Sequence, residues 1–415
     1  MKSVRPMEIN GTITAPPSKS IMQRAVAASC LSEDAAEIIN PSECDDSLAA
    51  LDLAEKLGAM IIRSGDRLWI TGGIWPAAKE LNCGESGLCL RMFSPIAALS
   101  REELLLRGTG TLCQRPISMV EHPLRDLGVH CESANGYPPL KLKGPLRSGT
   151  TVVDGSVTSQ FLSGLLLALP CVAGDSVIHV RNLKSRPYID ITLKMMEDFG
   201  IRITHDNYHT FVIQGNQKYR IGKYRIEGDW SGASFWLVAG ALGGSVCVQG
   251  LNMDSAQGDR KILEALEASG ASLKMEREGI KVEKNYLKAF TFDATDCPDL
   301  IPPLAVLACG CEGQTRIKGV ERLTFKESRR AEVLQKELSH CGADIRITGD
   351  WLEIQGRILS AGMVDSHHDH RIAMAAAVAG ILSKGEISIK DSGCISKSYP
   401  DFFEDFKRIG GKVHE

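Results

Sequence analysis

The chain has 415 residues, of which 43% are hydrophobic and 24% are charged, and its formal net charge is −3. This composition is typical of a globular protein, and a charge so near zero argues against a general nucleic-acid binder. At roughly 150 residues per domain, the length predicts two or three domains.

The 13 cysteines are scattered, and no CxxC pair occurs. Many lie in apolar runs, as do Cys30, Cys171 and Cys247, which is typical of buried thiols in a reducing compartment and not of disulfides or a zinc site. The N-terminus lacks an apolar signal core, and the apolar runs 165–173 and 373–382 are shorter than the roughly 20 residues that span a bilayer. We therefore expect a cytoplasmic protein with no membrane or nucleic-acid partner.

In chain order, the sequence opens with the alternating segment MEINGTITAP (7–16), which predicts a strand. An apolar helix follows in PPSKSIMQRAVAASCL (16–31). An amphipathic helix then ends at Gly58, before two strands that are joined by a turn. The glycine is expected to adopt the left-handed backbone that ends many helices.

This unit recurs six times. The helix-ending glycine returns at positions 58, 128, 200, 270, 342 and 410, which are 68 to 72 residues apart. The apolar helix returns in GESGLCLRMFSPIAAL, SVTSQFLSGLLLAL, DWSGASFWLVAGAL, DCPDLIPPLAVLA and HHDHRIAMAAAVAGIL. These helices should be buried, because they are apolar on nearly every side. A period this long exceeds the roughly 20–45 residues of common solenoids, so we predict two domains of three units each.

The ends of the chain are expected to meet in one domain. The sixth unit stops inside its strand pair, and segment 7–16 reads like its missing last strand. We therefore predict a discontinuous domain of residues 1–14 and 228–415, and an inserted domain of residues 15–227. The fold class is α/β, built from α+β repeats in a two-domain inverted, barrel-like architecture.

The starts of the apolar helices carry polar and charged residues. A helix N-terminus offers N–H groups and the positive end of the helix dipole, which suit phosphates and carboxylates. If the helices of the two domains start on facing surfaces, they surround one interdomain cleft, where we expect the active site. The residues at these starts include Lys19, Ser20, Arg24, Glu85, Arg91, Thr158, Ser159, Gln160, Asp299, Asp369, His370 and Arg371.

Further basic residues lie in the connecting segments. Arginine gives a fork that matches carboxylate and phosphate oxygens, and lysine gives a movable point charge. These residues are Arg115, Arg186, Lys326, Arg329, Arg330 and Lys397. The pattern indicates one or two small substrates with several negative charges.

The HHDHR segment could indicate a metal site. Consecutive helical residues point in different directions, however, and no further ligand follows at metal spacing. We therefore expect capping and substrate contacts there, and no metal.

Eight segments, in order, resemble the EPSP synthase family. They are PPSKSIMQR, CGESGLCLR, GTLCQRPI, DGSVTSQFLSGLLLALP, SRPYIDIT, FKESRR, DHRIAMA and CISKSYPDFF. The resemblance covers essentially the whole chain. It implies an enzyme, a 3-phosphoshikimate 1-carboxyvinyltransferase of the inverted α/β fold, that needs no cofactor and transfers the enolpyruvyl group of phosphoenolpyruvate to shikimate 3-phosphate. We expect a monomer.

The resemblance also implies which residues meet the two substrates. For shikimate 3-phosphate they are Lys19, Ser20, Arg24, Thr158, Ser159, Gln160, Ser185, Tyr188, Asp299 and Lys326. For phosphoenolpyruvate they are Lys19, Gly87, Arg115, Gln160, Arg330, Arg371 and Lys397. Within an addition–elimination reaction, Glu327 is expected to handle the proton at C3. Asp299 is expected to act on the 5-hydroxyl, with Lys19 assisting or competing for that role.

The sequence departs from the family pattern at several positions. Glu85 stands where the family usually has Asn, and an extra carboxylate beside an anion site should repel substrate unless it is paired or turned away. Leu88 and Thr158 replace Thr and Ser. Arg322 lies near the usual Asn, and Arg329 replaces the usual Asp.

Three alternatives remain. UDP-N-acetylglucosamine enolpyruvyl transferase is disfavoured, because its reactive cysteine is spaced differently from Cys113 and the chain lacks its KNAAL-like opening. RNA 3'-phosphate cyclase would need nucleotide chemistry for which no motif is present. A non-catalytic binder of phosphorylated metabolites would not need the titratable groups at the helix starts.

Overall fold

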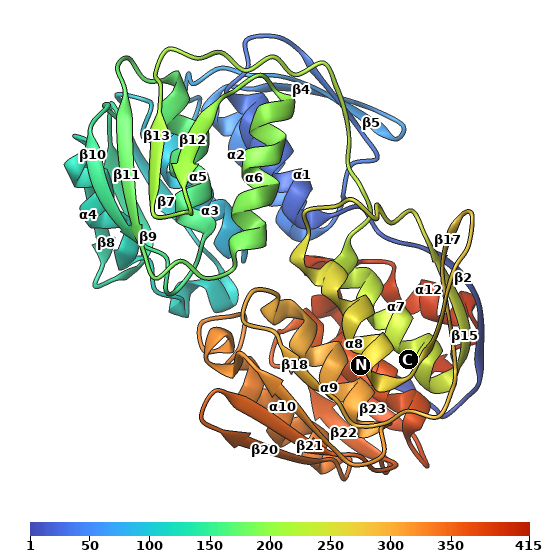
Figure 1. Ribbon diagram of the computed structural model, residues 1–415. Helices are drawn as coiled ribbons and strands as arrows, with labels where there is room; N and C mark the ends of the chain where they lie inside the picture. Colours follow the sequence, from blue (N-terminus) through green and yellow to red (C-terminus); the bar gives the residue numbers. More distant parts are fainter. The chain divides into compact units, whose positions relative to one another are not determined.

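The computed structural model describes all residues 1–415, and the chain forms two compact units (Figure 1). Unit 1 contains residues 1–16 and 227–415, and unit 2 contains residues 17–226. Each unit has three four-stranded sheets, which accounts for the six repeats predicted from the sequence.

Unit 2 is built from three β-α-β-α-β-β repeats. Its helices are α1 Lys19–Cys30, α2 Asp45–Leu57, α3 Gly87–Ala97, α4 Glu121–Asp126, α5 Gln160–Ala168 and α6 Arg186–Asp198. Its strands are β3 Ala36–Ile39, β4 Met60–Ser64, β5 Arg67–Thr71, β6 Glu80–Asn82, β7 Glu103–Arg107, β8 His130–Ala134, β9 Tyr137–Lys143, β10 Thr150–Asp154, β11 Ser176–Arg181, β12 Ile203–Asp206, β13 Thr210–Ile213 and β14 Lys223–Arg225. The sheet orders are β14-β3-β5-β4, β6-β7-β9-β8 and β10-β11-β13-β12.

Unit 1 repeats this plan. Its helices are α7 Trp230–Gly243, α8 Ile262–Ser269, α9 Ile301–Cys309, α10 Arg330–His340, α11 His370–Ala379 and α12 Phe402–Arg408. Its strands are β1 Lys2–Val4, β2 Ile9–Thr14, β15 Gly244–Gln249, β16 Ser272–Met275, β17 Gly279–Glu283, β18 Thr291–Asp293, β19 Gln314–Lys318, β20 Asp344–Thr348, β21 Trp351–Gln355, β22 Gly362–Asp365, β23 Ile387–Lys390 and β24 Val413–His414. The sheet orders are β16-β17-β15-β2, β18-β19-β21-β20 and β22-β23-β1-β24.

The prediction for segment 7–16 was wrong in one respect. The missing strand of the sixth repeat is β1, which lies between β23 and β24 with Val4 fully buried. Segment 7–16 instead forms β2, which pairs in parallel with β15 in the fourth sheet. In the other repeats of unit 1, the strand that precedes the buried helix pairs with the strand that follows it. Before α7 that strand is β14, which pairs with β3 of unit 2, so β2 takes the equivalent position beside β15.

The local signals in each repeat are confirmed. All six helix-ending glycines have left-handed backbones, with φ between 81° and 115°. Every residue of α3, α7, α9 and α11 is buried, as their apolar sequences predict. In α1, burial begins only at the third residue, so Lys19 and Ser20 are left half-buried at its start. The longest helix has 14 residues, and none combines the length and the apolar character needed to cross a membrane.

Candidate functional site

In unit 1, the predicted site residues lie at or before helix starts. Asp299 lies in the 3-10 turn η5 Pro298–Leu300, directly before α9. Lys326 and Glu327 precede α10, whose first residue is Arg330. Arg371 is the second residue of α11, and Lys397 ends the turn η8 Ser392–Lys397.

Arg330 is the centre of this group and is fully buried. Its Nε donates to Asp369 Oδ2 at 2.8 Å, and its Nη1 donates to Asp299 Oδ1 at 2.9 Å. Its Nη2 donates to Glu327 Oε2 and, at 3.1 Å, to Asp369 Oδ1. Three carboxylates from three separate segments therefore share one guanidinium. Such a buried charge is stable only while its partners compensate it.

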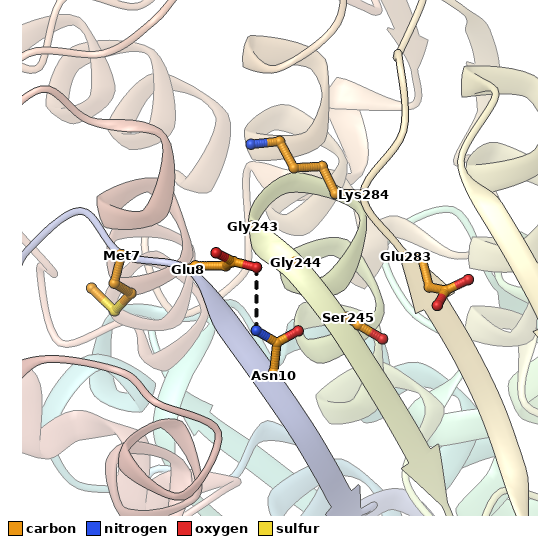
Figure 2. Close-up of a pocket in the computed structure, with 8 residues that line it drawn as sticks. All are labelled: Met7, Glu8, Asn10, Gly243, Gly244, Ser245, Glu283 and Lys284. Atoms are coloured by element: carbon orange, nitrogen blue, oxygen red, sulfur yellow. Dashed lines mark hydrogen bonds between the residues drawn. The ribbon is translucent and has the colours of Figure 1, made fainter.

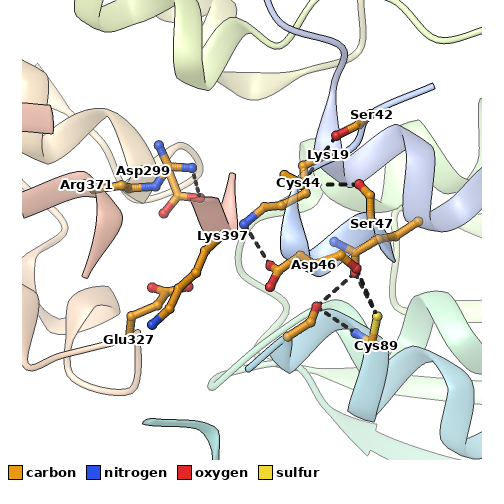
Figure 3. Close-up of polar contacts among 12 residues, drawn as sticks. Lys19, Ser42, Cys44, Asp46, Ser47, Cys89, Asp299, Glu327, Arg371 and Lys397 are labelled. Atoms are coloured by element: carbon orange, nitrogen blue, oxygen red, sulfur yellow. Dashed lines mark hydrogen bonds and ion pairs between the residues drawn. The ribbon is translucent and has the colours of Figure 1, made fainter. Parts of the chain in front are cut away.

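Asp299 connects this group to two further cations. Arg371 forms an ion pair with Asp299, which is drawn in Figure 3, and its Nη2 lies 3.3 Å from Asp299 Oδ2. Lys326 Nζ lies 3.1 Å from Asp299 Oδ1. Burial raises the pKa of Asp299, but Arg371, Lys326 and Arg330 together hold that pKa well below its usual value. Burial in turn lowers the pKa of Lys326. Asp299 is thus an ionised carboxylate, which is the form a general base requires.

Lys397 is held by the backbone. Its ammonium donates to the carbonyl of His368 at 2.6 Å. His367 and His368 both have left-handed backbones, and their side chains bind Glu337 and Asp391. The two histidines thus support the chain before α11, and their side chains bind different carboxylates.

A fourth carboxylate near this group, Asp259, has no predicted role. It is 5% exposed, and its Oδ1 has no hydrogen-bond partner. Burial and the neighbouring Asp299 raise its pKa to about 7, although Arg371 opposes them. The two neighbouring carboxyls thus differ: Asp259 retains its proton to near-neutral pH, whereas Asp299 is ionised.

Asp259→Asn is expected to stabilise the protein at pH 8 and to have little effect at pH 4. The folded state binds the Asp259 proton more tightly than the unfolded chain, so stability falls as pH rises from about 4 to 7, by up to about 1.4 kcal/mol per pH unit. Asparagine removes this loss. Urea unfolding of both proteins at pH 4, 6 and 8 measures the difference, with exposed Asp254→Asn as the control. A difference that does not change with pH would contradict the assignment.

In unit 2, Lys19 is the first residue of α1 and forms an ion pair with Asp46. Lys19 Nζ lies 2.9 Å from Asp46 Oδ2 (Figure 3), and both side chains are mostly buried. Asp46 was not predicted as a site residue. Its only sequence signal is its place in the acidic first turn of α2, which is common in structural helices.

Arg24 lies one turn further along α1 and is buried. Its guanidinium donates to the carbonyls of Ser20 and Tyr188, and to the hydroxyls of Thr192 and Ser163. Burial lowers its pKa to about 10. In this structure Arg24 thus ties α1 to α5 and α6, and its contact with a substrate stays a prediction.

Several predicted hydroxyl residues lie at the starts of α5 and α6. Thr158 Oγ1 accepts from the backbone N–H of Gln160 at 3.2 Å, and buried Ser159 is the N-cap of α5. Ser185 is the buried N-cap of α6 and has φ +59°, and Tyr188 follows in the first turn. These groups accompany two helix N-termini, which is an arrangement suited to a phosphate.

Arg115 follows the turn η1 Gly110–Gln114 and is buried against the start of α3. A Cβ on Gly87 would lie 2.8 Å from the Arg115 guanidinium carbon, so only glycine permits this contact. Glu85 Oε2 accepts from both the N–H and the hydroxyl of Thr111 at 2.9 Å. The Glu85 carboxylate is therefore paired with Thr111. Pairing of this kind was expected if a carboxylate at position 85 is not to repel an anionic substrate.

The structure shows two further contacts that were not predicted. Arg91 donates to Gln160 Oε1 and to the Pro116 carbonyl, both at 2.8 Å. Asp369, known from the sequence only as a helix-start residue, is a main partner of Arg330. Of the atypical arginines, Arg329 is exposed and forms an ion pair with Glu332, and Arg322 lies half-buried in η6 Val320–Leu323.

A separate pocket of about 580 Å³ lies in unit 1 where α7 passes into β15 (Figure 2). Its lining residues are Met7, Glu8, Asn10, Gly243, Gly244, Ser245, Glu283 and Lys284. Two of its contacts are the hydrogen bond from Asn10 Nδ2 to Glu8 Oε1 at 3.4 Å and the bond from the Lys284 N–H to the Gly244 carbonyl at 2.7 Å. None of the predicted site residues lines it.

The family model and two of the most similar curated proteins carry the same enzyme name. A family model described as EPSP synthase (3-phosphoshikimate 1-carboxyvinyltransferase) matches residues 4–406. Proteins named 3-phosphoshikimate 1-carboxyvinyltransferase from Clostridium novyi and Clostridium perfringens are 38% and 39% identical, and the alignments cover 99% and 98% of this chain and 97% and 98% of theirs.

Solved structures show the same fold. An EPSP synthase from Acinetobacter baumannii aligns with a TM-score of 0.83 and 26% identity, over 100% of this chain and 99% of its own. The enolpyruvyl transferase NikO from Streptomyces tendae aligns with a TM-score of 0.80 over 100% of this chain and 98% of its own, but its 17% identity supports the fold alone.

Proposed function

Because the chain belongs to the EPSP synthase family, we propose that the polar groups at the helix starts of units 1 and 2 bind and activate the two substrates of this reaction. The protein is a transferase of the 3-phosphoshikimate 1-carboxyvinyltransferase type, and it has the inverted α/β fold. It transfers the carboxyvinyl group of phosphoenolpyruvate to the 5-hydroxyl of shikimate 3-phosphate and releases phosphate. The observation that supports the residue assignment is the convergence of three carboxylates and two further cations on buried Arg330 and Asp299.

For shikimate 3-phosphate, we propose the groups at the starts of α1, α5 and α6, together with Asp299 and Lys326. The hydroxyls of Thr158, Ser159 and Ser185 suit the phosphate, because they accompany helix N-termini. The proposed contacts from unit 2 are Lys19, Ser20, Arg24, Thr158, Ser159, Gln160, Ser185 and Tyr188.

For phosphoenolpyruvate, we propose the arginine and lysine groups of both units. Each phosphate brings about −1.5 to −2 charges at pH 7, and each substrate adds a carboxylate, so several cations are needed. The proposed contacts are Lys19, Gly87, Arg115, Gln160, Arg330, Arg371 and Lys397. Among those in unit 1, Arg330, Arg371 and Lys397 are buried and therefore provide charge that water screens weakly.

The reaction proceeds by addition and then elimination. The 5-hydroxyl adds to C2 while C3 gains a proton, and the resulting ketal phosphate then loses phosphate and a C3 proton. We assign the hydroxyl proton to Asp299, which is ionised, with Lys19 assisting or competing, and the C3 proton to Glu327.

The contact with Arg330 bears directly on the role of Glu327. In the structure this contact favours the carboxylate form, which is the form that removes the C3 proton during elimination. A substrate anion that binds Arg330 competes with Glu327 for the guanidinium and so favours its protonation. This is the direction that the addition step requires, since Glu327 is proposed to give a proton to C3 in that step.

We also propose a division into residues 1–14 with 228–415 and an inserted domain of residues 15–227. The limits of the two compact units, which lie within two residues of these positions, support it. A cytoplasmic location is supported by thirteen free cysteines, of which Cys113 alone is exposed. A monomer is supported by the burial of the apolar helices within each unit.

The test is phosphate release by the purified protein with phosphoenolpyruvate and either shikimate 3-phosphate or UDP-N-acetylglucosamine. We expect release with shikimate 3-phosphate alone. Release with the sugar nucleotide would assign the chain to the alternative transferase. Tight binding of shikimate 3-phosphate without release would instead indicate a non-catalytic binder.

A further inference from the structure

The segment from Gly110 to Pro116, which carries Arg115, is attached to the start of α3 at both of its ends. At the first end, the carboxylate of Glu85 accepts two hydrogen bonds from Thr111. Gly110 has a left-handed backbone and packs closely on this carboxylate, so a Cβ at position 110 would displace the Glu85 side chain. A charged acceptor makes these bonds stronger than neutral ones.

At the second end, the guanidinium of Arg91 donates to the carbonyl of Pro116, the residue that follows Arg115. Arg91 is 2% exposed and lies one turn into α3. Between the two ends, the Arg115 guanidinium rests on Gly87. The position of Arg115 therefore depends on three contacts: the bonds from Thr111 to Glu85, the bond from Arg91 to Pro116, and its own packing on Gly87.

Arg91 also determines how the amide of Gln160 is oriented. Its Nη1 donates to Gln160 Oε1 at 2.8 Å, so the amide oxygen faces Arg91 and the two N–H donors of Nε2 face elsewhere. An anionic ligand needs donors, and the reversed amide would present an acceptor to it. One buried arginine thus orients Gln160 and also anchors the segment that carries Arg115.

We propose that Glu85 and Arg91 are positioning residues for phosphoenolpyruvate. They hold the Gly110–Pro116 segment against α3 and present the Arg115 guanidinium and the Gln160 N–H donors to the substrate anion. This inference rests on the proposed function, which assigns Arg115 and Gln160 to phosphoenolpyruvate. It gives Glu85, a departure from the family pattern, a constructive role in the site.

The first test is steady-state kinetics with each substrate varied in turn. Glu85→Ala is expected to raise the KM for phosphoenolpyruvate about tenfold or more, because a displacement of about 1 Å in a binding group can cost about 10²-fold. Its KM for shikimate 3-phosphate should stay within about twofold, since Glu85 contacts Thr111 in the segment that carries Arg115, and Arg115 is assigned to phosphoenolpyruvate alone. Glu85→Gln, which retains an acceptor for Thr111, should recover most of the loss. Arg91→Met should raise both KM values, because Gln160 is assigned to both substrates, and Arg91→Lys should recover part.

A double-mutant cycle tests whether Glu85 acts through Arg115. If it does, Glu85→Ala added to Arg115→Ala should change the KM for phosphoenolpyruvate by less than about threefold. The controls are exposed Glu55→Ala and Arg101→Met, which should behave as wild type. Additive effects, or an equal rise of both KM values in Glu85→Ala, would overturn the proposal.

Hydrogen exchange separates this proposal from the proposed function. The Thr111 N–H should exchange at least about tenfold faster in Glu85→Ala than in wild type or Glu55→Ala, because its acceptor is removed. If the wild-type protein is inactive, the proposed function is wrong. The exchange rate of the Thr111 N–H would then still test whether Glu85 and Arg91 hold the segment against α3. Unchanged exchange in both Glu85→Ala and Arg91→Met would overturn the attachment whether or not the protein is active.

Discussion

Replacement of Glu327 by glutamine is expected to lower kcat by about 10²- to 10⁴-fold, which is the usual contribution of a positioned proton-transfer group. Glutamine has nearly the same shape and keeps an oxygen that can accept from Arg330 Nη2, so the buried cluster should persist. The amide cannot carry a proton to or from C3. We therefore expect KM values within a few-fold of wild type, measured by phosphate release with each substrate varied.

A second measurement makes the Glu327 prediction specific. Solvent deuterium should appear at C3 of the product with wild type, and its rate of incorporation should fall with kcat in Glu327→Gln. Glu332→Gln is the matched control, because Glu332 lies two residues into α10, is about half-exposed and contacts only Arg329 among the cations. A kcat within tenfold of wild type in Glu327→Gln would assign the C3 proton to another group.

Replacement of Arg330 by methionine is expected to destabilise the protein by about 3–5 kcal/mol, the usual result of leaving buried charges uncompensated. Arg330 is fully buried and contacts Asp299, Glu327 and Asp369. Its removal leaves three carboxylates close together without their shared guanidinium. Activity should also be lost, because phosphoenolpyruvate is proposed to bind the same group. Urea unfolding followed by circular dichroism measures the loss of stability.

The adjacent arginine provides a close control. Arg329 is 71% exposed and forms an ion pair with Glu332, so Arg329→Met should change the free energy of unfolding by no more than about 1 kcal/mol. The double variant Arg330→Met/Asp369→Asn should be less destabilised than the two single effects predict when added, since it removes one uncompensated carboxylate. Equal stability of the two arginine variants would show that the buried cluster contributes no net stability.

The repeat and the positions of its helices along the chain could be predicted from local sequence patterns. Gly58 and its five counterparts adopt the left-handed backbone because a helix end needs it and glycine adopts it readily. The apolar helices are buried because they have no polar face, and their polar first turns brought residues such as Lys19, Asp299 and Arg371 to helix starts. These are local properties, which residues a few positions apart decide.

The partners that meet across long sequence separations could not be predicted in this way, because they depend on how the elements pack. The alternation of segment 7–16 correctly indicated a strand, but a strand's pattern does not name its neighbour, and β2 joined β15 while β1 completed the sixth sheet. Likewise, Arg330 and Asp369 are 39 residues apart, and Arg91 and Gln160 are 69 apart. The charge and hydrogen-bonding capacity of each side chain are properties of the sequence. The oxygen to which each buried guanidinium donates depends on how the helices pack. A buried polar group can bond only to the groups that the fold places within hydrogen-bond distance.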